Sequence, residues 1–144
     1  MLKVVIDTNV LVSAFLKRPS LPDLIITQIQ KRRLLLCLTL EIMAEYEGVL
    51  ERDKFKLLRN KHGQDIKALF SSFRREALWV KPGKPVEVIK DDPSDNKFLE
   101  CALESRADYF ISGNIRHFPS GKFKKTRIVT PHEFINHTAP LFFK

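Results

Sequence analysis

Short apolar segments alternate along this chain with longer segments of helical periodicity. The apolar runs, each of strand length, occupy residues 4–6, 34–38, 78–80, 109–111 and 128–129. Apolar residues recur at helical spacing over about 21–31, 39–50 and 64–76, in a segment that begins near 93, and in a short one after 131. Strands that alternate with helices predict a mostly parallel sheet covered by helices on both faces. The expected fold class is therefore α/β, a three-layer α/β/α sandwich.

Loop signals do not divide the chain. The strongest one, Lys81-Pro82-Gly83-Lys84-Pro85, is short and fits a connection between a strand and a helix near the edge of the sheet. No internal repeat, low-complexity segment or long linker is present in the sequence. We therefore expect residues 1–144 to form a single domain.

The charge balance changes the picture, because the chain is strongly basic. Lys and Arg number 25 against 17 acidic residues, which gives a net charge of +8 and a pI near 9.7. A pI above about 9 is typical of proteins that bind nucleic acid, although charge alone specifies no fold. The acidic residues are densest in segments 41–51 and 91–95. This separation fits a small acidic site for cations within surroundings that attract phosphates.

Cysteine usage and hydropathy indicate the compartment. Cys37 and Cys101 lie inside apolar stretches and have no metal-binding spacing, so we interpret them as buried free thiols in a reducing environment. No signal peptide and no run of about 20 apolar residues is recognisable. The expected localisation is cytoplasmic, without a membrane partner.

The first apolar strand ends abruptly in a carboxylate, Asp7. In open α/β sheets, ligands bind just beyond the carboxyl ends of the strands, which makes Asp7 a candidate for metal or phosphate chemistry. The alternative is a structural one: Asp7 is the N-cap of a helix that begins around Val10. Asn9 would serve equally well as that cap.

Further oxygen-bearing side chains follow at the starts and edges of later elements. Glu45 borders the apolar stripe of the helix over 39–50, for which Thr39 is the expected N-cap. In the acidic turn, Asp92 can cap a helix with Pro93 at its first position, and Asp95 would lie in the first turn, near the positive end of the helix dipole. Three carboxylates within residues 91–95 nevertheless repel one another, and a divalent cation would relieve that repulsion.

The strand over 109–111 also ends in polar residues. Ser112 and Asn114 flank Gly113, which we expect to let the chain turn sharply at this point. Together with the carboxylates, these side chains form a set of hard oxygen ligands that suits Mg²⁺ or Mn²⁺.

In this order and spacing, these segments resemble the PIN-domain ribonucleases, and within them the toxin-like branch akin to VapC-type toxins of toxin–antitoxin systems. The residues that carry the resemblance are Ile6-Asp7-Thr8-Asn9, Glu41-Ile42-Met43-Ala44-Glu45-Tyr46, Asp92-Pro93-Ser94-Asp95 and Ser112-Gly113-Asn114. The resemblance implies a PIN-like sandwich whose catalytic residues are Asp7, Glu45, Asp95 and Asn114.

Within that set, the resemblance implies that Asp7, Glu45 and Asp95 bind the metal. The family usually has Asp at the fourth position, and Asn114 offers an oxygen without a charge. Glu41 is a rival for the helical glutamate, but Glu45 is preferred because it lies nearer the apolar stripe. The resemblance further assigns supporting roles to Thr8, Asn9, Asp92 and Ser112.

The implied function is hydrolysis of RNA phosphodiester bonds with Mg²⁺ or Mn²⁺, by the toxin of a toxin–antitoxin pair. The implied partners are an RNA substrate, a cognate antitoxin and a second copy of the chain in a homodimer. Arg116 and His117, just after the Ser-Gly-Asn turn, are expected to contact RNA phosphates. For His117, a role as general base is the alternative.

Three other functions stay open or are disfavoured. Because Asn114 brings no charge, the chain could instead be a catalytically weak or inactive PIN-fold module that binds RNA or a protein. A phosphotransferase of the haloacid-dehalogenase type is disfavoured, since Asn9 stands where its DxDxT pattern has the second Asp. A purely structural interaction protein has only the tail Leu141-Phe142-Phe143 in its favour.

Overall fold

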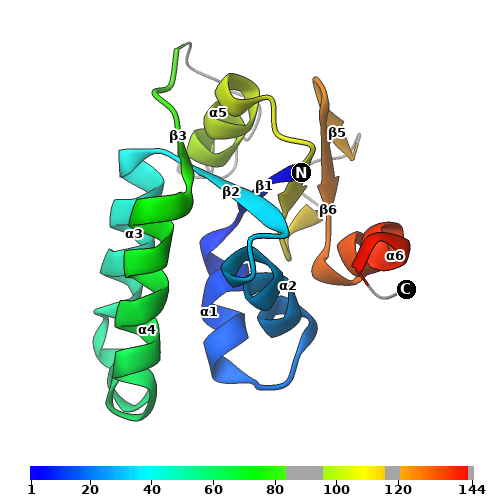
Figure 1. Cartoon of the computed structure of the whole chain (residues 1–144). Coiled ribbons are helices and arrows are strands. Elements are labelled where there is room, and N and C mark those ends of the chain that lie inside the picture. The colour runs from blue at the N-terminus through cyan, green and yellow to red at the C-terminus, as the bar shows by residue number, and fades with distance from the viewer. Residues whose placement is uncertain (84–95, 116–120, 143–144) are drawn as a thin grey trace.

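A six-stranded sheet with the order β3-β2-β1-β4-β6-β5 organises the chain (Figure 1). This computed structural model describes residues 1–83, 96–115 and 121–142, with side chains up to residue 141 in the last range. The strands are β1 (Leu2–Ile6), β2 (Leu34–Leu38), β3 (Leu78–Trp79), β4 (Tyr109–Ile111), β5 (Lys122–Phe123) and β6 (Thr126–Val129). All neighbouring pairs are parallel except β5 and β6. The prediction of a mostly parallel sheet is confirmed.

Six α-helices occupy the described residues between and after these strands. They are α1 (Thr8–Leu16), α2 (Leu21–Gln30), α3 (Leu40–Leu50), α4 (Lys56–Glu76), α5 (Asn96–Ser105) and α6 (Pro131–Phe142). Thr39 caps α3 as expected, because its hydroxyl oxygen accepts a hydrogen bond from the Ile42 N–H at 3.1 Å. None of these helices is both long and apolar enough to cross a bilayer.

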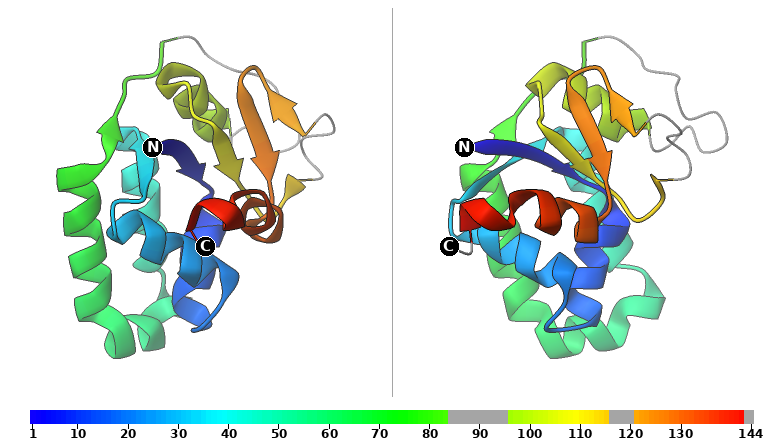
Figure 2. Two further views of the ribbon diagram at one scale, coloured as in Figure 1. Left: turned by 45° about the vertical axis from the view of Figure 1, so that its right-hand side comes forward. Right: turned by 90° about the vertical axis from the view of Figure 1, so that its right-hand side faces the viewer.

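The sheet is covered on both faces. Helix α5 packs against β1, β2 and β4, while α2 contacts β2 and α6 contacts β4 and β6. Figure 2 shows the sheet between α5 and the pair formed by α2 and α6. Because both faces are covered, β1 is apolar throughout its buried part, and Val4, Val5 and Ile6 are each at most 1% exposed. The predicted layering of helix, sheet and helix is confirmed.

Helices α3 and α4 run alongside each other away from the sheet (Figure 1). An ion pair joins Arg74 of α4 to Glu47 of α3 at 2.8 Å, and the rings of Tyr46 and Phe73 pack with centroids 6.3 Å apart. Helix α4 is kinked at His62, whose backbone leaves the helical region.

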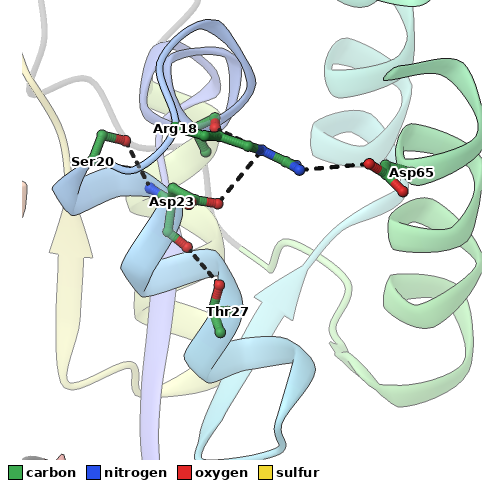
Figure 3. Close-up of polar contacts among 6 residues, drawn as sticks. Arg18, Ser20, Asp23, Thr27 and Asp65 are labelled. Atoms are coloured by element: carbon green, nitrogen blue, oxygen red, sulfur yellow. Dashed lines mark hydrogen bonds and ion pairs between the residues drawn. The ribbon is translucent and has the colours of Figure 1, made fainter. Parts of the chain in front are cut away.

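The segment between α1 and α2 is fastened to α4 by Arg18 (Figure 3). Its guanidinium lies 3.6 Å from a carboxylate oxygen of Asp23 in α2 and 3.5 Å from one of Asp65 in α4. Ser20 caps α2 by accepting a hydrogen bond from the Asp23 N–H at 3.2 Å. The C-terminal end of α1 and the N-terminal end of α2 therefore lie close to the part of α4 that follows its kink.

The two cysteines are buried and unpaired with each other, as predicted. Burial raises the pKa of both thiols, so neither is a reactive thiolate. At the C-terminal end, α6 extends to Phe142 and Leu141 is exposed, whereas Phe143 lies outside the described residues.

Candidate active site

Asp7 lies where the central strand β1 ends. Its backbone N–H donates to the Ile111 carbonyl at 3.0 Å, which ties the ends of β1 and β4 together. The residue is only 5% exposed. Asp7 is also the N-cap of α1, because its Oδ1 accepts a hydrogen bond from the Asn9 N–H at 3.4 Å. The capping interpretation is therefore confirmed, and α1 begins at Thr8, two residues before the expected Val10.

Ser112 holds the other oxygen of Asp7. It is fully buried after β4, and its hydroxyl donates to Asp7 Oδ2 at 2.8 Å. The same hydroxyl oxygen accepts the Asn114 N–H at 3.1 Å. Ser112 thus fixes the orientation of the Asp7 carboxylate and shapes the turn that leads to Asn114. Asn114 itself is exposed at this edge of the sheet.

The turn after β4 does not depend on glycine. Gly113 does not adopt a positive φ, and a Cβ added there would meet no atom within 4 Å. The chain turns after β4 as expected, but without a backbone conformation special to glycine, and the hydrogen bond from the Asn114 N–H to the Ser112 hydroxyl shapes the turn.

Burial raises the pKa of the Asp7 carboxyl above its ordinary value of 3.8, because desolvation disfavours the charged form. The hydrogen bonds from Ser112 and the Asn9 N–H act in the opposite direction, and the negative charge of Glu45 raises the pKa further. A buried carboxylate beside another negative charge is stabilised when a cation binds between them.

Glu45 of α3 is the second carboxylate at this place. The Thr8 hydroxyl donates to its Oε2, so the residue directly after Asp7 holds Glu45 close to the Asp7 segment. Lys97 Nζ lies 2.5 Å from its Oε1. Glu41, the rival glutamate, is exposed one turn earlier on the helix. The structure therefore brings Glu45, and not Glu41, next to the Asp7 segment.

Lys97 was missed by sequence reasoning. It lies in the first turn of α5, its side chain is only 10% exposed, and it pairs with a residue 52 positions earlier in the chain. Its position two residues after Asp95, at the start of an otherwise apolar helix face, is the only sequence signal that could have drawn attention to it. Lysines are almost never fully buried unless they are paired.

Four of the predicted site residues lie outside the described residues: Asp92, Asp95, Arg116 and His117. Their predicted roles stay predictions. The first described residue of α5, Asn96, is 7% exposed and directly follows Asp95 in the sequence. Within the described ranges, no group of three or more His, Cys, Asp or Glu side chains is placed to hold a metal, since this part of the site contributes only Asp7 and Glu45.

The donor chemistry of the described part nevertheless fits a hard divalent cation. Its two acidic groups are carboxylates, and the neighbouring Thr8 and Ser112 supply hydroxyl groups that orient them. Magnesium and manganese are bound by few carboxylates together with water and substrate phosphates. Asp7 and Glu45 would hold such an ion, and Asp95 is the predicted third ligand.

Comparison with known proteins places the chain in a family. The family model of the PIN domain matches residues 3–116, which include Asp7, Glu45, Asp95 and Asn114. The chain is also similar to the uncharacterized protein MJ1680 of Methanocaldococcus jannaschii, at 28% identity over 142 residues that cover 93% of this chain and 90% of that protein. PIN domains are generally nucleases. With a family match that spans most of its length, the chain belongs to the PIN domain family.

Proposed function

We propose that this protein is a metal-dependent endoribonuclease that hydrolyses RNA phosphodiester bonds with Mg²⁺ or Mn²⁺. The observation that carries the proposal is the meeting of Asp7 and Glu45 at the carboxyl edge of the sheet. There Ser112 orients the first carboxylate and Thr8 the second. Two oriented carboxylates in a basic chain of the PIN domain family are the combination that metal-assisted hydrolysis of a polyanion requires.

Each site residue that the structure describes has a defined task in this proposal. A divalent cation, when bound, supplies positive charge for the transition state and makes a water molecule more acidic. Asp7 and Glu45 hold that ion. Ser112 keeps Asp7 in place by donating to Oδ2, and Thr8 does the same for Glu45 at Oε2. Asn114, exposed at the same edge, offers an uncharged oxygen to water or to a substrate group.

A groove whose lining includes Asn9, two residues after Asp7, is suited to RNA. It has a volume of about 590 Å³, lies between α1 and the first half of α4, and begins at Asn9. Its apolar wall includes Phe55 and the exposed Leu57, and its cationic residues are Lys54 and Lys61. Apolar and aromatic side chains support unstacked bases, while lysines neutralise phosphates. We propose that a single-stranded part of the substrate follows this groove to the carboxylates.

The two lysines of the groove provide a test. Replacing both Lys54 and Lys61 with Gln is expected to weaken RNA binding several-fold. It should also reduce the slope of log affinity against log salt by about 0.7 for each lost phosphate contact. Binding is measured by fluorescence anisotropy with a labelled single strand, on the Asp7→Asn background so that the RNA stays intact.

The matched control removes the same charge elsewhere, by changing Lys124 and Lys125 in the turn between β5 and β6 to Gln. An equal loss of affinity in this control would mean that only the overall charge matters, and would remove the groove from the proposal.

We further propose that the protein is the toxin of a toxin–antitoxin pair, on the basis of the motif order that resembles the toxin-like branch. A cognate antitoxin and a second copy of the chain are then the proposed protein partners. Induced expression in bacteria is expected to arrest growth, and Asp7→Asn is expected to abolish the arrest. Arrest that persists with Asp7→Asn at equal protein levels would contradict the toxin role.

Two observations favour a second candidate, a PIN-fold module that binds RNA without cutting it. Asn114 carries no charge, and Glu45 is already paired with Lys97. Cleavage of a structured RNA pool with Mg²⁺ or Mn²⁺, beside an EDTA control, separates the two candidates. Cleavage products that depend on the metal support the nuclease. Tight RNA binding without products supports the binding module.

A further inference from the structure

A lysine is paired with Glu45, one of the two carboxylates that would hold a metal ion. Lys97 Nζ lies 2.5 Å from Glu45 Oε1, and the Thr8 hydroxyl donates to Oε2. Both oxygens of this carboxylate are thus engaged by groups of the chain itself. An ammonium at this distance is a charge-assisted partner, which is stronger than a neutral hydrogen bond.

The ion pair between Lys97 and Glu45 is largely shielded from water and lies beside an aromatic ring. The Lys97 side chain is 10% exposed and that of Glu45 26% exposed, so water screens the pair only weakly. Lys97 Nζ also lies 5.6 Å from the centre of the Phe98 ring, where a cation is favourable. Phe98 is fully buried and anchors this turn of α5 against β4. The ammonium is therefore held at Glu45 by packing as well as by charge.

The pair also affects the rest of the site. Asp7 and Glu45 carry like charges, and Thr8, the residue after Asp7, holds Glu45 close by. Without a cation the two carboxylates would repel each other. Lys97 neutralises one of the two carboxylates from within the chain. A divalent cation held by Glu45 would compete with this ammonium for the carboxylate, which would reduce the affinity for the ion.

We propose that Lys97 is a positioning residue that acts as the built-in counter-ion of Glu45 and competes with the divalent cation for it. The inference deepens the proposed function and rests on it, since it takes the cation to bind at Asp7 and Glu45. Lys97 keeps the site assembled without metal and sets a weak affinity for the ion.

Calorimetric titration of Mn²⁺ into the RNA-free full chain tests this. The Lys97→Met chain is expected to bind Mn²⁺ about tenfold more tightly than the wild type, because a positive charge next to a ligand is removed. Lys97→Gln retains a neutral hydrogen-bond donor for Glu45 and is expected to shift the affinity for Mn²⁺ in the same direction. This second variant keeps the test valid if Lys97→Met does not fold. Lys125→Met, an equal charge change on an exposed turn, is expected to bind as the wild type does.

Thermal unfolding gives a second readout. In EDTA, Lys97→Met is expected to unfold at a lower temperature than the wild type, because Glu45 loses its partner. Saturating Mn²⁺ should then raise its unfolding temperature by more than it raises that of the wild type. A purely structural lysine would lower stability without increasing the affinity for Mn²⁺.

The outcomes separate the inference from the proposed function. The role of Lys97 alone is overturned if the wild type binds Mn²⁺ and cleaves RNA but both Lys97 variants bind Mn²⁺ no more tightly than the wild type does. Absence of Mn²⁺ binding in the wild type and in both variants overturns the inference together with the metal dependence of the proposed function.

Discussion

Replacing Asp7 with Asn is expected to lower the rate of metal-dependent RNA cleavage by about 10²- to 10³-fold. The carboxylate is placed at the end of β1 by the hydrogen bond to Ile111 and oriented by Ser112. An amide of the same shape has a single accepting oxygen, so its NH2 group would donate to the Ser112 hydroxyl instead of accepting from it, and it brings no negative charge to a cation. A loss of several kcal/mol of transition-state stabilisation corresponds to this change in rate. Single-turnover cleavage of a labelled RNA in Mn²⁺ measures it.

The same variant is expected to be no less stable than the wild type at neutral pH. Burial raises the pKa of the Asp7 carboxyl above its ordinary value of 3.8, so Asp7 ionises less readily in the folded protein than in the unfolded chain. Asp7 therefore favours folding most below that ordinary pKa, and this contribution is lost as pH rises through 3.8 towards the pKa in the folded state. Asn at this position does not titrate.

Thermal unfolding in EDTA between pH 3 and pH 7 tests this expectation. The unfolding temperature of Asp7→Asn, relative to that of the wild type, should rise with pH over this range. A variant that is clearly less stable at pH 7 would show that the cap on α1 depends on the negative charge. In that case, the loss of activity of Asp7→Asn could not be assigned to the missing negative charge at the cation.

Replacing Phe98 with Ala is expected to destabilise the protein by about 3–5 kcal/mol. Phe98 is fully buried, and its ring stacks on that of Phe110 with centroids 5.6 Å apart. Through this contact α5 is fixed on β4, and Lys97 is thereby positioned beside Glu45. Equilibrium unfolding in urea measures the change, which corresponds to a decrease in unfolding temperature of roughly 10–17 °C.

Phe98→Leu is the matched control, since it retains most of the apolar volume. It is expected to cost less than about 1.5 kcal/mol. A loss below about 1 kcal/mol for Phe98→Ala would show that α5 is held in place by other contacts, and the positioning of Lys97 would need another explanation.

Much of the fold could be predicted because its strands are apolar runs bounded by polar residues. The strands over 34–38 and 109–111 have the predicted bounds, and Thr39 caps α3 as expected. The first half of α4 was missed because the segment from Lys56 to the kink at His62 is mostly exposed and shows no apolar stripe. β5 was missed because it has two residues and is joined to β6 through Lys124, a non-glycine residue with a φ of 53°.

The site could be predicted in part for a related reason. Asp7 and Ser112 follow directly after strands, and the parallel arrangement of β1 and β4 places those ends together. Glu45 was identifiable from its position at the edge of an apolar helix face. Lys97 was not, since its burial and its pairing with Glu45 arise only when α3 and α5 pack together. Asp95, the predicted third ligand, lies outside the described residues.

The central claim is that Asp7 and Glu45 form a metal-dependent nuclease site. The rate of RNA cleavage against Mn²⁺ concentration, for wild type and Asp7→Asn purified in the same way, tests it most directly. We expect a rate that rises and saturates with Mn²⁺ in the wild type, vanishes in EDTA, and stays near zero at every concentration in the variant. Equal rates in the two proteins, or cleavage by the wild type in EDTA, would contradict it.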